Sequence, residues 1–160
     1  MTNKKSGLEF LLQLFFAFLM KWWGIRDPIK VLRKCIKNEE WFKGIVLSTA
    51  FLEGIGIKVL TSHFKGQIEP EKIRRLRLEQ TILLLYASEM IDTPTYSKMM
   101  EVKSFRNSIV HFEAFTVPKL QRKEAKEIIE KAMICLKALI EIPQPLNEPL
   151  PELKILKEEK

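Results

Sequence analysis

The stretch PTYSKMMEVKSFRNSIVHF, residues 94–112, decides the fold of this chain. Apolar residues recur in it every three or four positions, which places them on one face of an α-helix. These residues are Met99, Val102, Phe105 and Ile109. We therefore predict a helix from Pro94 to about Phe112 whose apolar stripe faces a protein core, with polar residues flanking the stripe at its C-terminal end.

Three of those polar residues have chemical capability. Arg106 is a permanent cation, Asn107 can donate and accept hydrogen bonds, and His111 titrates near neutral pH. At about 100° per residue, Asn107 and His111 lie one turn apart, whereas Arg106 lies about 140° around the helix from His111 and about 7.5 Å along it. A second copy of the helix across a two-fold axis would gather two Arg and two His around one phosphate. The alternative is a hydrogen-bonded structural network or a solvated stripe.

The segment Ser104–Phe112 resembles the RNA-cleaving motif of the HEPN superfamily, in which Arg is followed by Asn, Asp or His and then by a His a few positions later. Here Arg106 and Asn107 are followed by His111. The resemblance implies an all-α, up-and-down four-helix bundle and a homodimer with its active site at the subunit interface. It also implies a metal-independent endoribonuclease, without cofactor, that leaves a 2′,3′-cyclic phosphate and a 5′-hydroxyl.

For this chemistry we expect His111 to act as base or acid, Arg106 to clamp the phosphate, and Asn107 to orient His111 or the substrate. Residues beside them on the same helix are predicted to contact RNA: Lys103, Ser104 and Ser108. Glu53 lies among apolar residues and is predicted to support the site as a partner of Arg106, the alternative being that it points to solvent.

The resemblance leaves two functional classes open. HEPN proteins are often toxins paired with a small nucleotidyltransferase as antitoxin, in toxin-antitoxin or defence systems, and others only bind nucleotides or RNA or serve as scaffolds. We therefore expect either a ribonuclease toxin or a non-catalytic binding module that works with a nucleotidyltransferase.

Length and composition fit one soluble domain. The chain has 160 residues, of which 46% are hydrophobic and 29% charged, with a net charge of +7 that favours acidic partners such as RNA. The abundance of Lys, Glu and Ile suggests a thermophilic source. Cys35 and Cys135 stand far apart in apolar patterns without zinc-ligand spacing, so we expect core thiols, no metal, and a reducing, cytoplasmic location. The densest basic run is either a phosphate contact or a solvated face: Lys72, Arg74, Arg75 and Arg77.

Three regions are expected: an N-terminal helical extension over 1–38, the bundle over 39–142, and a proline-rich tail over 143–160. In the extension, Asp27 and Pro28 are suited to cap and begin a helix to Lys37.

Further helices are predicted over Glu39–Phe64, Pro70–Ile91 and Pro118–Glu141. In the first of these, Gly54 and Gly56 permit close approach of another backbone. The helix over Pro70–Ile91 is expected to bury Ile73, Leu76, Leu83, Ala87 and Met90. The inward residues expected on the helix over Pro118–Glu141 are Leu120, Ala125, Ile128, Ile129, Ala132, Cys135, Leu136 and Leu139.

Leu8–Trp23 is the most apolar segment of the chain. Glu9, Gln13 and Lys21 interrupt it, and its unbroken apolar part is too short to span a bilayer. We predict a helix that covers the bundle or a subunit interface, with a helix lying on a membrane surface as the alternative.

Overall fold

The computed structural model of the chain describes residues 27–110 and 121–143, and its regular structure there is helical. No β-strand occurs within these two ranges, which confirms the all-α prediction. The predicted helix over Leu8–Trp23 and the tail beyond residue 143 lie outside the described residues. The helices are α2 (Pro28–Lys37), α3 (Trp41–His63), α4 (Pro70–Arg74), α5 (Leu78–Ala87), α6 (Thr93–Val110) and α7 (Arg122–Glu141).

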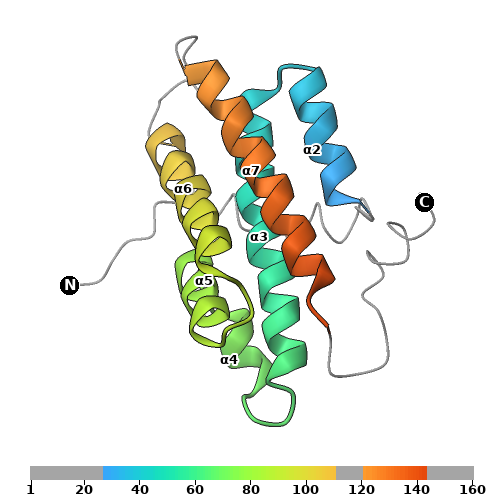
Figure 1. Ribbon diagram of the computed structural model, residues 1–160, viewed down its shortest axis with the longest axis vertical. Coiled ribbons are helices and arrows are strands. Elements are labelled where there is room, and N and C mark those ends of the chain that lie inside the picture. Colours follow the sequence, from blue (N-terminus) through green and yellow to red (C-terminus); the bar gives the residue numbers. More distant parts are fainter. Residues whose placement is uncertain (1–26, 111–120, 144–160) are drawn as a thin grey trace.

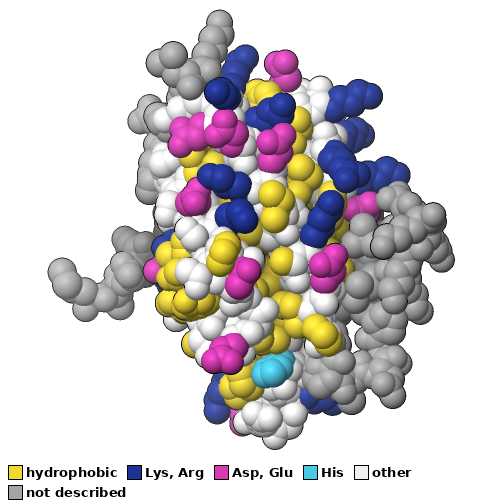
Figure 2. All heavy atoms as spheres, viewed as in Figure 1, with side chains coloured by type: hydrophobic (Ala, Val, Ile, Leu, Met, Phe, Trp, Pro, Cys, Tyr) yellow, Lys and Arg dark blue, Asp and Glu magenta, His cyan; other side chains and the backbone are white. Residues whose placement is uncertain are grey.

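The helix α3 is the centre of the fold. It packs against α2, α4, α5, α6 and α7, while α6 also contacts α5 and α7. Figure 1 shows α6 and α7 side by side and running in opposite directions, with α2 on the other side of α7 from α6. Charged side chains of both signs are interspersed on the outer surface of α7 (Figure 2), as expected for a helix that buries one face only.

The beginning of α2 follows the predicted capping chemistry. The Asp27 carboxylate accepts a hydrogen bond from the backbone N–H of Lys30 at 3.0 Å, and Pro28 occupies the first turn. Proline is favourable there because the first N–H groups of a helix have no partner within the helix. The predicted bounds Pro28–Lys37 are confirmed.

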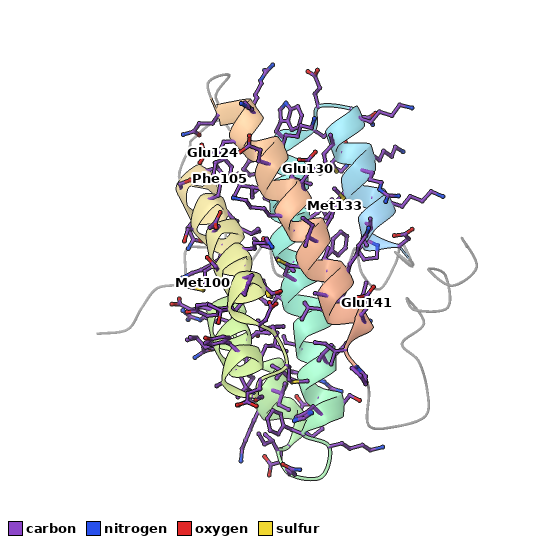
Figure 3. All side chains as sticks on the ribbon, viewed as in Figure 1. Met100, Phe105, Glu124, Glu130, Met133 and Glu141 are labelled. Atoms are coloured by element: carbon purple, nitrogen blue, oxygen red, sulfur yellow. The ribbon has the colours of Figure 1, made fainter. Side chains whose placement is uncertain are left out.

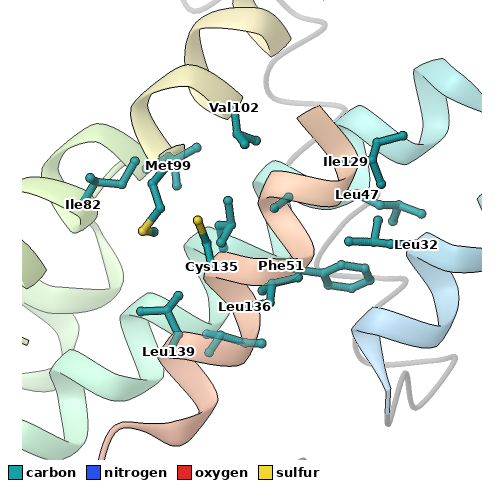
Figure 4. Packing of buried hydrophobic residues seen from close by; sticks show 14 of the residues in the cluster. Leu32, Leu47, Phe51, Ile82, Met99, Val102, Ile129, Cys135, Leu136 and Leu139 are labelled. Atoms are coloured by element: carbon teal, nitrogen blue, oxygen red, sulfur yellow. The ribbon is translucent and has the colours of Figure 1, made fainter. Parts of the chain in front are cut away.

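One hydrophobic core joins the helices (Figure 4). The apolar stripe predicted on α6 is buried, with Met99, Val102 and Ile109 fully inaccessible and Phe105 only 7% exposed. The inward residues predicted on the described part of α7 are also all buried: Ala125, Ile128, Ile129, Ala132, Cys135, Leu136 and Leu139.

The prediction of a single helix over Pro70–Ile91 is wrong. The helix α4 ends at Arg74 and α5 begins at Leu78, with Arg77 in an extended conformation between them. On a continuous helix Ile73 and Leu78 would lie about 140° apart, so only one of them could face the core. The break lets both be buried.

The core positions predicted on this segment are correspondingly wrong at two places. Leu83 is 45% exposed and Ala87 is exposed, whereas Leu78, Ile82 and Leu85 are buried. The prediction continued the helical repeat from Ile73 through the whole segment. The break changes which positions of α5 face the core. The described ranges contain six helices, and the predicted four-helix arrangement stays a prediction.

Two glycines allow α3 to approach its neighbours closely. A Cβ atom at Gly56 would lie 2.7 Å from Cγ2 of Thr81 on α5, and a Cβ at Gly44 would lie 2.5 Å from Cδ1 of Ile129 on α7. Both distances are shorter than a van der Waals contact, so glycine sets the spacing of these helix pairs. At Gly56 the predicted close approach is made by the side chains of Thr81 and Leu85 rather than by the backbone of α5.

By length and composition, α3 is the one helix of the described ranges that could cross a membrane. Of its most apolar window, 67% is buried inside the protein. That burial is typical of the central helix of a globular fold, which other helices contact on several sides.

Candidate functional site

The helix α6 carries the candidate site, and its start is fixed by Asp92. The Asp92 carboxylate accepts a hydrogen bond from the backbone N–H of Thr95 at 2.9 Å. Side-chain and backbone hydrogen bonds from Thr95 lower the pKa of Asp92 below its ordinary value, because they stabilise the charged carboxylate. An anionic cap also interacts favourably with the positive end of the helix dipole.

The burial of the apolar stripe determines where the polar side chains of α6 lie. Because Phe105 and Ile109 face the core, Ser104, Asn107 and Ser108 are exposed on the remaining surface of the helix. Arg106 and Lys103 are half-buried beside the core. Figure 3 shows Phe105 near the C-terminal end of α6 and Met100 further toward its start. The site therefore begins at the edge of the core and extends to solvent.

Arg106 and Asn107 are joined by a hydrogen bond. The Nη1 atom of Arg106 donates to Oδ1 of Asn107 over 3.1 Å. A guanidinium has five N–H groups, so this bond engages one of them and holds the group beside the Asn107 side chain. The Asn107 amide nitrogen keeps two donors, and the pair together presents donors of the kind that bind phosphate oxygens.

Lys103 lies one helical turn before this pair and is held by α5. Its Nζ atom is 2.7 Å from Oε2 of Glu79, with the lysine side chain 21% exposed and the glutamate side chain 52% exposed. Sequence reasoning missed Glu79, since the two residues are 24 positions apart and only the packing of α5 on α6 brings them together. A phosphate at Lys103 has to compete with this carboxylate.

The two serines predicted to contact substrate differ in their surroundings. The Ser108 hydroxyl donates to the backbone carbonyl of Phe105 at 2.7 Å, whereas Ser104 is exposed on the helix surface. On the opposite flank of α6, Glu101 forms an ion pair with Lys131 of α7. The hydrogen bond to Glu101 is the first cause of a raised pKa at Lys131. Ion pairs thus tie α6 to both neighbouring helices.

The remaining predicted site residues are placed less fully. His111 lies outside the described residues, so its predicted role as base or acid stays a prediction. Glu53 is half-buried on α3, the central helix, and its predicted support of Arg106 stays a prediction as well. The hydrogen bond described for the Arg106 guanidinium goes to Asn107.

An aromatic pair that sequence reasoning did not single out stands between α5 and α6. The rings of Tyr86 and Tyr96 stack with their centroids 4.6 Å apart and an interplanar angle of 28°. The Tyr86 hydroxyl lies 3.0 Å from Oγ1 of Thr93, and Tyr86 is 38% exposed. The pair fixes the start of α6 against the end of α5.

The basic run of α4 is partly neutralised. Lys72 pairs with Glu69 at 3.2 Å and Arg74 with Glu71 at 2.6 Å, and all four side chains are exposed. Such pairs are typical of a solvated helix face. Of the two predictions for this run, the solvated face is therefore better supported than a phosphate contact.

Both cysteines are buried free thiols, and burial raises the pKa of each, that of Cys135 to about 11. Neither is suited to act as a nucleophile or metal ligand near neutral pH, because both roles need the thiolate. In the part of the chain that the structure describes, no three side chains among His, Cys, Asp and Glu lie together as metal ligands would.

No family model, no curated protein and no solved structure matches this chain.

Proposed function

We propose that this protein is a metal-independent endoribonuclease of the HEPN type, with Arg106, Asn107 and His111 as its catalytic residues. The observation that carries the proposal is the hydrogen-bonded pair of Arg106 and Asn107 on the outer face of α6. Its remaining N–H groups can bind the oxygens of a phosphodiester, and the motif continues to His111.

The reaction uses the nucleophile that RNA supplies. A base removes the proton of the 2′-hydroxyl, O2′ forms a bond to phosphorus, the bond from phosphorus to O5′ breaks, and an acid protonates O5′. The products are a 2′,3′-cyclic phosphate and a 5′-hydroxyl, with no change in oxidation state. Arg106 binds the phosphate as negative charge develops, and His111 serves as base or acid.

A homodimer completes the proposal. In it the His111 side chains of two subunits divide the base and acid roles, and an up-and-down arrangement of the long helices brings two copies of α6 together. Within the described ranges, α3, the α4–α5 pair, α6 and α7 would form that four-helix unit, with α2 belonging to the extension. RNA is the substrate, the cytoplasm the expected location, and a nucleotidyltransferase the expected antitoxin partner.

The test measures cleavage of RNA by the purified full chain in the presence of a chelator. We expect Arg106→Ala to lower the rate by about 10²–10³-fold and His111→Ala by about 10²–10⁴-fold. Arg106→Lys should cleave RNA little faster than Arg106→Ala, because an ammonium cannot bind phosphate in the bidentate manner of a guanidinium. Equal cleavage by the parent and both alanine variants would refute the catalytic proposal.

Matched controls are present in the chain. His63 is exposed at the end of α3, where its ring contacts Phe64 edge-on with centroids 4.8 Å apart, and Arg75 is exposed at the end of α4. His63→Ala and Arg75→Ala remove the same chemical groups from the other end of the fold. Both should cleave at the parental rate.

A second candidate function is an RNA- or nucleotide-binding module without catalysis that works beside a nucleotidyltransferase. The engagement of Lys103 by Glu79 favours it, since polar groups that satisfy one another are typical of a stable surface network. In this case RNA binds in an Arg106-dependent manner and is recovered intact, and His111→Ala leaves binding unchanged.

A further inference from the structure

The outer face of α2 carries an unbroken stripe of positive charge. Lys30, Arg33, Lys34 and Lys37 occupy positions i, i+3, i+4 and i+7 of the helix, and all four are exposed. At about 100° per residue they fall within a sector of about 100°, and at 1.5 Å per residue they extend over about 10.5 Å. In Figure 2, dark blue side chains gather along the upper right of the molecule, over α2.

The stripe is held in place by the opposite face of the helix. Ile29, Leu32 and Cys35 are buried against the core, and α2 packs on α3 and α7. Since the apolar face is fully used by this packing, α2 cannot rotate to hide its cations. We call Lys30, Arg33, Lys34 and Lys37 the α2 basic stripe.

Among the described residues, the four cations of the α2 basic stripe lie together on one helix face without an ion pair, whereas several other surface cations are paired. Within residues 27–110 and 121–143, none of its four side chains pairs with a carboxylate, whereas Lys43, Lys72, Arg74 and Lys126 each pair with a glutamate three or four residues away. Two of the nearby carboxylates in the sequence are engaged otherwise. Asp27 caps α2, and Glu40 binds Lys43 at 3.0 Å.

Helix stability does not explain the α2 basic stripe. Lys34 and Lys37 lie in the last turn of α2, where a cation is favourable, but the first turn contains no acidic residue and carries Lys30. A cation near the positive end of a helix dipole is unfavourable. Mutual repulsion of four like charges at these spacings adds to that cost. A bound external anion would offset both the unfavourable interaction of Lys30 with the helix dipole and the repulsion among the four cations.

We infer that the α2 basic stripe binds the sugar-phosphate backbone of a nucleic acid, at a place separate from the candidate site on α6. Phosphates of one strand follow one another at about 3.4 Å along a duplex, so a stripe of about 10.5 Å reaches about three of them. The stripe has no aromatic side chain, so the contact recognises charge and not sequence.

An anionic membrane is the competing partner, and the structure favours nucleic acid. A helix that binds a bilayer lays an apolar face into it. The apolar face of α2 is buried against α3 and α7, and its outward side is basic.

The location of the α2 basic stripe makes it an auxiliary contact. The helix α7 separates α2 from α6 (Figure 1), so a nucleic acid that reaches both must cross α7. The inference goes beyond the proposed ribonuclease activity and does not depend on it, because binding to the backbone needs no cleavage.

The experiment measures binding of the full chain to a labelled 30-nucleotide RNA in which every ribose is 2′-O-methylated. This RNA lacks the 2′-hydroxyl nucleophile, so the measurement is independent of whether the protein cleaves RNA. The test variant is Lys30→Gln, Arg33→Gln, Lys34→Gln and Lys37→Gln combined. The control variant combines Lys43→Gln, Lys72→Gln, Arg74→Gln and Lys126→Gln, which likewise removes three lysines and one arginine, but from paired positions.

The slope of log association constant for RNA against log salt concentration should be smaller in magnitude by about 2 to 3 for the test variant than for the parent. Each phosphate bound by a cation contributes about 0.7–0.9 to this slope. The control variant, with the same net charge as the test variant, should keep the parental slope. Thermal melting checks that both variants fold. Equal slopes for the test and control variants would overturn the inference, since net charge alone would then explain binding.

A second arm uses vesicles of phosphatidylcholine containing phosphatidylserine. Stripe-dependent binding to these vesicles, without stripe-dependent binding to the 2′-O-methyl RNA, would replace the nucleic acid by a membrane and overturn the inference. Loss of cleavage in the Arg106 and His111 variants is a separate result, so failure of the ribonuclease proposal and failure of this one are distinguishable.

Discussion

Lys103 of α6 and Glu79 of α5 are joined by an ion pair whose charged atoms lie 2.7 Å apart. The lysine side chain is 21% exposed, and its pairing partner lies on another helix. This pair stands one helical turn before Arg106, so its carboxylate is the negative charge that a phosphate arriving at the candidate site has to displace.

Glu79→Gln is therefore expected to strengthen RNA binding. The exposed ion pair is worth about 1 kcal/mol at most, so the gain in affinity should be about fivefold or less. Binding of 2′-O-methyl RNA at low salt measures it. Glu101→Gln, which releases Lys131 on the other flank of α6 with the same change of charge, is the control. If both variants bind equally, Lys103 does not bind phosphate.

The shifted phase of α5 can be tested by two neighbouring substitutions. Ile82 is fully buried and Leu83 is 45% exposed. Ile82→Ala should lower the free energy of unfolding by about 2–5 kcal/mol, while Leu83→Ala should change it by about 0.5 kcal/mol or less. Denaturant unfolding measures both. A larger loss of stability for Leu83→Ala than for Ile82→Ala would instead support a continuous helix over Pro70–Ile91.

Gly56 of α3 and Thr81 of α5 meet where these two helices pack. Gly56→Ala places its methyl group against Cγ2 of Thr81 and should lower the free energy of unfolding by about 1–3 kcal/mol. Thr81→Ser removes that methyl group, so the double variant should recover part of the loss. A double-mutant cycle measures the coupling. If the stability changes of Gly56→Ala and Thr81→Ser simply add, the added methyl group does not contact Thr81, and α3 and α5 have moved apart to accommodate it.

The cap at Asp92 gives α6 a defined dependence on pH. Its pKa is lower in the folded protein than in the unfolded chain, so its stabilising effect is fully present above the unfolded pKa and is lost as pH falls through the folded value. The melting temperature of the parent should exceed that of Asp92→Ala at pH 7, and the difference should shrink below about pH 4. If the difference in melting temperature does not change with pH, the Asp92 cap stabilises α6 by hydrogen bonding alone, and the charge of its carboxylate contributes nothing.

The two thiols should be inert while the protein is folded. Burial raises the pKa of Cys135 to about 11 and also raises that of Cys35, so very little thiolate exists near neutral pH. Iodoacetamide should modify neither cysteine in the native protein and both in denaturant. Fast native alkylation at either position would contradict the described burial.

Periodicity predicted the parts of the fold in which one helix faces one core. The stripe of α6 and the inward face of α7 were predicted residue by residue, because a long amphipathic helix repeats its signal over several turns. The segment between Pro70 and Ile91 failed for the opposite reason. A short break at Arg75–Arg77 leaves each piece too few turns to define its own phase, and only the burial of both Ile73 and Leu78 reveals it.

For the candidate site, the chemistry expected from the sequence stays a prediction, and the neighbours of its residues could not be predicted. Helical spacing placed Asn107 one turn from His111, but it did not predict the hydrogen bond between Arg106 and Asn107. It could not supply Glu79, whose approach to Lys103 depends on how α5 packs against α6. The α2 basic stripe, by contrast, follows an i, i+3, i+4, i+7 pattern in the sequence. Among the described residues none of its four cations has an ion pair, whereas two cations of the run on α4, Lys72 and Arg74, are paired with glutamates.

The central position of α3 has a consequence for amide hydrogen exchange. This helix contacts all five other described helices, so we expect the amides of its buried residues to exchange only when the bundle as a whole unfolds. The five-residue α4 can open alone, since it rests on α3 at the edge of the bundle. The slowest-exchanging amides should therefore cluster in α3, and their exchange rate reports the global free energy of unfolding.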